Sequence, residues 1–114
     1  MPPREWRLRV GDILDAIARI EQYVVGLTFE QFTADRKTVD AVVRNLEVIG
    51  EAVRHLSNES ENLPAGVPWA DIAGMRNVLI HEYFGVDLQI IWQTVSSDLP
   101  PLSAELKRFL HENV

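Results

Sequence analysis

Cysteine is missing from this 114-residue chain. Its absence excludes a disulfide framework, a thiolate metal site and a cysteine nucleophile. No apolar run approaches the roughly 20 residues that span a bilayer. The N-terminal stretch 1–7 also lacks the apolar segment of a secretory signal. We therefore expect a cytoplasmic protein with no membrane partner.

Basic residues are also scarce. Lys and Arg number 11 against 17 Asp and Glu, which gives a formal net charge of −6. Proteins that grip nucleic acid through many phosphates are usually basic, so this charge argues against extended nucleic-acid binding by one chain. A small site with a few well-placed cations, or a basic partner, remains compatible with it. The N-terminus is locally basic, and Arg4, Arg7 and Arg9 can contact phosphates or simply be solvated.

What the sequence does have is helical periodicity. Period-two alternation is brief wherever it occurs, whereas apolar residues recur every three or four positions in several long segments. These segments are approximately 5–25, 36–56, 68–84, 88–95 and 102–110. The length suits one domain with one modest core. We predict a single all-α domain over residues 1–114, an up-and-down bundle of four or five helices.

Capping and breaking residues predict where these helices begin and end. Gly26 should stop the first helix, and one substantial loop is expected over 57–66, where polar and turn residues concentrate. The pair Pro100-Pro101 should interrupt the chain before the last helix. The residues expected to cap helices are Thr28, Asp35 and Asp87.

The segment 68–84 carries the most informative chemistry. Arg76, His81 and Tyr83 lie close together in it, and Asn77 follows the arginine. A guanidinium binds phosphate, an imidazole moves protons near neutral pH, and a phenol offers a modifiable hydroxyl. The alternative is a surface arginine, a satisfied histidine and an interfacial tyrosine.

A helical wheel places this group away from the core. At about 100° per residue, Arg76 and Tyr83 share one stripe, while Asn77 and His81 share its neighbour. The sector expected to face the core contains Ile72, Met75, Val78, Leu79 and Val86. Between the two polar stripes lie Ile80 and Phe84. This partly apolar second face predicts a two-fold dimer that brings two copies of the group to one cleft. Alternatively, the two apolar residues meet the last helix and the polar ones are solvated.

A second polar stripe lies on the helix over 36–56. Glu47, Glu51 and His55 follow one another at intervals of four residues. Di-metal bundles use paired Glu-x-x-His segments at an interval of three, and no second segment completes such a site, so we expect no metal here. A solvated charged face is the simpler interpretation. Glu51 is kept as a secondary candidate for the dimer cleft.

The sequence resembles the HepT-like toxins of the HEPN superfamily. Residues 76–83 match its R-x4-H-x-Y motif. The other similar segments are 12–14 (DIL), 40–52 (DAVVRNLEVIGEA), 67–69 (VPW), 74–77 (GMRN) and 98–100 (DLP). The resemblance implies a helical homodimer that cleaves RNA without metal or other cofactor. It also implies a nucleotidyltransferase antitoxin that uses ATP and Mg to transfer AMP to Tyr83 and silence the toxin.

In such an enzyme His81 would act as acid or base, and Arg76 would stabilise the phosphorane. Asn77 would orient His81 or bind phosphate, and Tyr83 would contact phosphate or stack on a base. One alternative is a non-catalytic helical module that binds a nucleotidyltransferase. Another is a nucleotide-binding helical domain.

Overall fold

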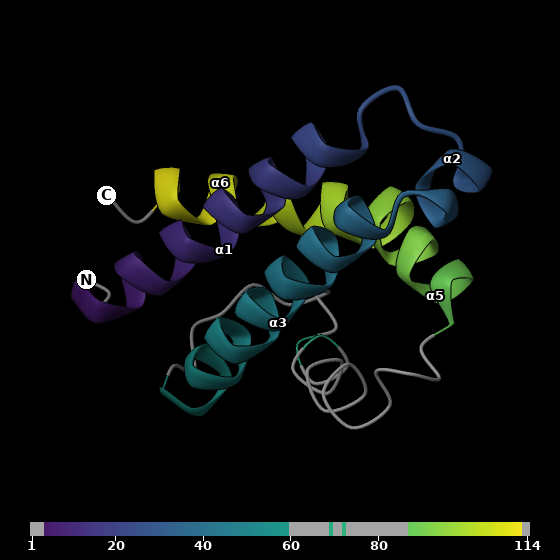
Figure 1. Ribbon diagram of the computed structural model, residues 1–114. Helices are drawn as coiled ribbons and strands as arrows, with labels where there is room; N and C mark the ends of the chain where they lie inside the picture. The colour runs from purple at the N-terminus through teal and green to yellow at the C-terminus, as the bar shows by residue number, and fades with distance from the viewer. Residues whose placement is uncertain (1–3, 60–68, 70–71, 73–86, 113–114) are drawn as a thin grey trace.

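The computed structural model describes residues 4–59, 69, 72 and 87–112 (Figure 1). These residues form helices and short connections, with no strand among them. The elements are α1 (Arg4–Val24), α2 (Phe29–Ala34), α3 (Arg36–Glu59), α5 (Leu88–Gln93), the π-helical turn η2 (Thr94–Asp98) and α6 (Leu99–Glu112). The predicted all-α class is confirmed. In this part of the chain no helix is both long and apolar enough to cross a membrane.

The first helix forms because its apolar residues fall on one side. Trp6, Val10, Ile13, Ile17 and Ile20 are each no more than 1% exposed. The helix ends where Gly26 adopts a φ of 77°, a conformation that costs glycine little. The predicted helix and its stop are confirmed to within one residue at each end.

A capping box starts α2. The backbone N–H of Gln31 donates to Thr28 Oγ1 at 3.1 Å, and the N–H of Thr28 donates to Gln31 Oε1 at 2.9 Å. Asp35 then caps α3, since its carboxylate accepts from the Thr38 N–H at 3.3 Å and from Thr38 Oγ1 at 2.7 Å. Both predicted caps are confirmed.

The long helix α3 buries the predicted stripe, whose members are Val39, Val42, Val43, Leu46, Ile49, Val53 and Leu56. Because α3 continues to Glu59, the prediction that a loop begins at residue 57 is wrong. Residues 57–59 extend the last turn of the helix instead. The remainder of that predicted loop lies outside the described residues.

The chain is helical from Leu88 to Glu112, so the predicted break at Pro100-Pro101 is wrong. Asp87 caps this stretch as expected, accepting from the Gln89 N–H at 2.9 Å. The helix then widens into a π turn before Leu99, where α6 begins. Both prolines fall in the first turn of α6, directly after the π turn that the Leu99 N–H closes on the Thr94 carbonyl oxygen, and this widening of the helix makes room for the proline rings. The prolines are therefore tolerated there.

The core lies between α1 and α3, which make the most extensive contact, and is closed by α6 and α2. Phe109 of α6 meets Trp6 of α1 with ring centroids 4.6 Å apart. Phe32 of α2 meets Trp92 of α5 at 5.1 Å. Trp69 and Ile72 are helical and pack on this core, as predicted for the sector that contains Ile72.

Candidate functional site

The predicted motif residues Arg76, Asn77, His81 and Tyr83 lie outside the described residues. Their grouping in one cleft and their catalytic roles therefore stay predictions. Glu51, the secondary candidate, lies on α3 and is described. Its surroundings define the polar site that this part of the chain presents.

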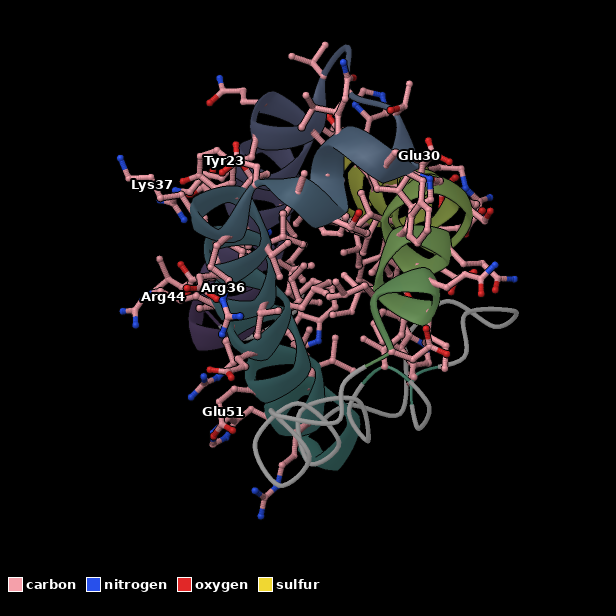
Figure 2. The ribbon with its side chains drawn as sticks, turned by 45° about the vertical axis from the view of Figure 1, so that its right-hand side comes forward. Tyr23, Glu30, Arg36, Lys37, Arg44 and Glu51 are labelled. Carbon is pink, nitrogen blue, oxygen red and sulfur yellow. The ribbon has the colours of Figure 1, made fainter. Side chains whose placement is uncertain are left out.

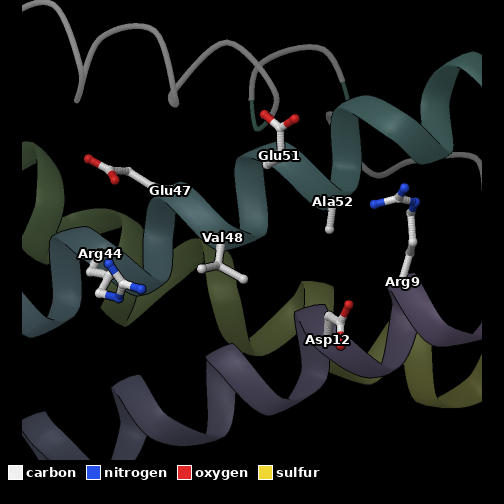
Figure 3. Close-up of a pocket in the computed structure, with 7 residues that line it drawn as sticks. All are labelled: Arg9, Asp12, Arg44, Glu47, Val48, Glu51 and Ala52. Atoms are coloured by element: carbon white, nitrogen blue, oxygen red, sulfur yellow. The ribbon is translucent and has the colours of Figure 1, made fainter.

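A groove of about 310 Å³ runs between α1 and α3 (Figure 3). Ala52, which is 5% exposed, also lines it, and its short side chain leaves space between the two helices. The remaining lining residues are Arg9, Asp12, Arg44, Glu47, Val48 and Glu51. Figure 3 shows Arg9 and Arg44 at opposite ends, with the carboxylates of Asp12 and Glu51 between them and that of Glu47 at the Arg44 end.

Helix periodicity explains the α3 side of the groove. Arg44, Glu47, Val48 and Glu51 are separated by three, one and three residues, so they share one face of the helix. Figure 2 shows Arg44 and Glu51 projecting from the same side of α3, away from the core. Val48 lies between them and is 38% exposed, although valine is usually buried. We call these four residues the α3 face.

One acid–base pair is formed at the end of this face. Nε2 of His55 lies 3.2 Å from Oε1 of Glu51, and the side chains are 42% and 40% exposed respectively. The carboxylate fixes the orientation of the imidazole and pairs with it when it is protonated. The described residues contain no group of three or more acidic or histidine side chains that could hold a metal ion. Because both side chains are partly exposed, the Glu51–His55 pair can also exchange hydrogen bonds with a bound molecule.

Asp35 and Arg108, which lie outside the groove, both have pKa values that differ from those of the free side chains. Hydrogen bonds from the Thr38 side chain and backbone hold the pKa of the Asp35 carboxyl below its usual value. A hydrogen bond to the Glu105 carboxylate raises the pKa of the Arg108 guanidinium on α6. Both shifts reflect local helix contacts.

The sequence predicted the charged α3 side of the groove, with Glu47, Glu51 and the interleaved Arg44, but missed its α1 side, which Arg9 and Asp12 supply. Arg44 has a local signal, because it shares the helical stripe of Glu51. Arg9 and Asp12 have no such signal, since their position depends on how α1 packs against α3.

Comparison with known proteins supplies the family. Residues 13–109 match the family described as "Ribonuclease HepT-like". A protein of Thermococcus cleftensis named "Probable ribonuclease HepT" is 43% identical over 97 residues, covering 85% of this chain and 88% of the relative. A protein of Caldanaerobacter subterraneus named "Putative RNase TTE0752" is 44% identical over 100 residues, covering 88% and 89%. No solved structure matches significantly. The resemblance is confirmed: this chain belongs to the HepT-like ribonuclease family.

Proposed function

We propose that this chain is the toxin of a toxin–antitoxin pair and cleaves RNA as a metal-independent endoribonuclease. The observation that carries the proposal is a complete Arg76–His81–Tyr83 motif inside the matched span 13–109. Relatives at 43% and 44% identity whose names include ribonuclease or RNase support the same activity. An RNA substrate also accords with residence in the cytoplasm.

The proposed reaction begins at the ribose 2′-hydroxyl. A neutral His81 takes its proton while the 2′-oxygen attacks the adjacent phosphorus. The bond from 2′-oxygen to phosphorus forms, and the bond from phosphorus to 5′-oxygen breaks. The partner subunit's His81 gives a proton to the departing 5′-oxygen. This assignment needs a homodimer, since one chain supplies one His81.

Arg76 contributes charge stabilisation. Its planar guanidinium offers two parallel donors to the non-bridging oxygens, where negative charge grows in the transition state. Asn77 orients His81 or holds phosphate, and Tyr83 contacts phosphate or stacks on a base. The reaction balances without any metal or cofactor.

Silencing is proposed to occur at Tyr83. A nucleotidyltransferase antitoxin, using ATP and Mg, would join the Tyr83 oxygen to the α-phosphorus of ATP; the hydroxyl gives up its proton, the bond between the α-phosphorus and the bridging oxygen to the β-phosphorus breaks, and pyrophosphate leaves. The attached AMP adds bulk and negative charge beside Arg76 and His81. RNA is then excluded by both sterics and repulsion.

Cleavage of total RNA in the presence of EDTA tests the enzyme. Arg76→Ala and His81→Ala should each lower the rate by about 10²-fold or more, because each removes transition-state stabilisation or proton transfer. Arg108→Ala and His111→Ala are matched controls: both residues are exposed on α6 and should leave the rate unchanged. Undiminished cleavage by the motif variants, or cleavage only with added metal, would contradict the proposal.

A second candidate is a non-catalytic module that binds a nucleotidyltransferase. The net charge of −6 favours it, because RNA-binding proteins are usually basic. Expression of the chain alone separates the two. Growth arrest that His81→Ala relieves supports the nuclease, whereas harmless expression of unmodified protein supports the module.

A further inference from the structure

We propose that the first turns of α1 bind the phosphate backbone of the RNA substrate, outside the cleavage motif. The contacts come from Arg7 and Arg9, which leave α1 on either side of an exposed leucine, Leu8. The inference rests on the proposed function, because its ligand is the RNA that the enzyme would cut. It adds a surface that holds a strand extending from the cleft, whatever the sequence of that strand.

Positive charge is concentrated at the start of the chain. Three arginines and one glutamate give residues 1–11 a net charge of +2, although the whole chain carries −6. The rest of the chain therefore carries −8. A polyanion is repelled by this larger part and attracted at the beginning of α1.

The charge order of α1 opposes its helix dipole. The partial positive charge at a helix N-terminus favours acidic side chains in the first turn, and the partial negative charge at the C-terminus favours basic ones in the last turn. In α1 the first turn contains Arg4 and Arg7 beside Glu5, while the last turn contains Glu21 and no basic residue. Helix stability therefore does not explain the arginines. A local preference broken in this way is expected at a functional surface.

The two arginines flank the outward side of α1. Successive residues are about 100° apart around a helix, so Arg7 and Arg9 leave the axis roughly 200° apart, with Leu8 midway between them. Leu8 is 59% exposed, whereas Trp6 and Val10 on the core side are 1% and 0% exposed. A strand that crosses the outward side meets a guanidinium on each flank and an apolar side chain in the middle. The guanidinium groups then pair with phosphate oxygens, and Leu8 contacts a base or ribose.

The surroundings of the arginines are compatible with this contact. Both side chains are partly exposed, and each already has an interaction within the chain. A guanidinium carries five N–H donors, so one such interaction does not prevent it from binding phosphate. Arg9 also lines the groove that contains Glu51, and Figure 3 shows it reaching from α1 towards Ala52 of α3. It therefore joins the start of α1 to the polar groove.

An acidic protein would also be attracted by these arginines, but the neighbouring groove disfavours it. The groove lining holds the carboxylates of Asp12, Glu47 and Glu51 against two arginines. A protein surface wide enough to cover the start of α1 would face these carboxylates as well. A single RNA strand is narrow enough to follow α1 and avoid them, so RNA is the better fit.

Binding of single-stranded RNA tests the surface. A full-length chain with His81→Ala, which stops cleavage in the proposed mechanism, is titrated against a fluorescently labelled RNA oligonucleotide at several salt concentrations and followed by anisotropy. Arg7→Gln and Arg9→Gln should each weaken binding about threefold or more, and should each make the slope of log affinity against log salt shallower by about 0.7. Arg7→Lys keeps the charge and should keep the slope. Arg19→Gln, at an exposed position in the acidic half of α1, is the matched control and should bind like the parent chain.

The outcomes separate this inference from the proposed function. Unchanged affinity and an unchanged salt slope in both glutamine variants would overturn the inference and leave the nuclease proposal standing. If the wild type binds this RNA through the arginines but does not cut it, the nuclease proposal fails, and the surface remains an RNA-binding one. Polyglutamate is the second probe. If it binds the parent chain more tightly than the RNA does, the surface suits an acidic protein and the inference is wrong.

Discussion

Replacement of Trp6 measures how much its contact with Phe109, between α1 and α6, contributes to the free energy of unfolding. The side chain is 1% exposed, and its ring lies 4.6 Å from that of Phe109 with an interplanar angle of 51°. Trp6→Ala removes a large buried surface and leaves a cavity, so it should lower the free energy of unfolding by about 3–5 kcal/mol. A chain of 114 residues has a total of roughly 6–17 kcal/mol at about 0.05–0.15 kcal/mol per residue.

Trp6→Phe should behave differently. The indole Nε1 is buried and has no hydrogen-bond partner in the described part of the chain. Phenylalanine removes this donor, recovering about 1–3 kcal/mol of desolvation free energy. It also loses some apolar area but keeps a ring against Phe109. These effects oppose one another, so the net change should stay within about 1 kcal/mol.

Urea unfolding followed by far-ultraviolet circular dichroism gives both values. The comparison must be made at one protein concentration, because self-association of the proposed homodimer would add to apparent stability. A Trp6→Phe variant as unstable as Trp6→Ala would refute the reasoning. It would mean either that the indole N–H is bonded or that the larger ring is indispensable.

The remaining predictions concern the α3 cap and the paired site. Hydrogen bonds to Thr38 depress the pKa of Asp35, so its contribution to stability is complete above the unfolded-state pKa and is lost as pH falls through the folded-state pKa. In urea unfolding between about pH 5 and pH 2.5, Asp35→Asn should lose less stability than the wild type, since the amide keeps the cap without titrating; an identical pH dependence would contradict this. For the site, co-expression of differently tagged unmodified and His81→Ala chains, followed by purification over both tags, would give a pair that carries His81→Ala in one chain only. If one histidine takes the proton and the other gives it, this heterodimer should cleave RNA at least about tenfold more slowly than the unmodified pair; full or half activity would contradict the shared roles.

Local signals explain why most of the described fold was predictable. Thr28, Asp35 and Asp87 all make the capping contacts that their residue types suggest. The apolar stripes of α1 and α3 are buried as their spacing requires. Each of these features depends on residues within one or two helical turns, which a single sequence displays.

The errors arose where a local rule had two possible outcomes. A proline pair can end a helix or lie in the first turn of one. Here both prolines lie in the first turn of α6, directly after the π turn. The groove was missed for a different reason. Arg9 and Arg44 are 35 positions apart in the sequence, and only the packing of α1 on α3 brings them to one recess.

The acidity of the chain bears on how the proposed site would be controlled. With a net charge of −6, affinity for RNA must come from a few cations, concentrated at the cleft and at the start of α1. In the proposed homodimer, two-fold pairing would double those cations locally. Because the net charge is negative, long-range attraction of the whole chain for RNA would be weak. Under the proposed mechanism, one AMP on Tyr83 would therefore add repulsion where the few cations act, and a single modification per site would be enough to turn RNA away.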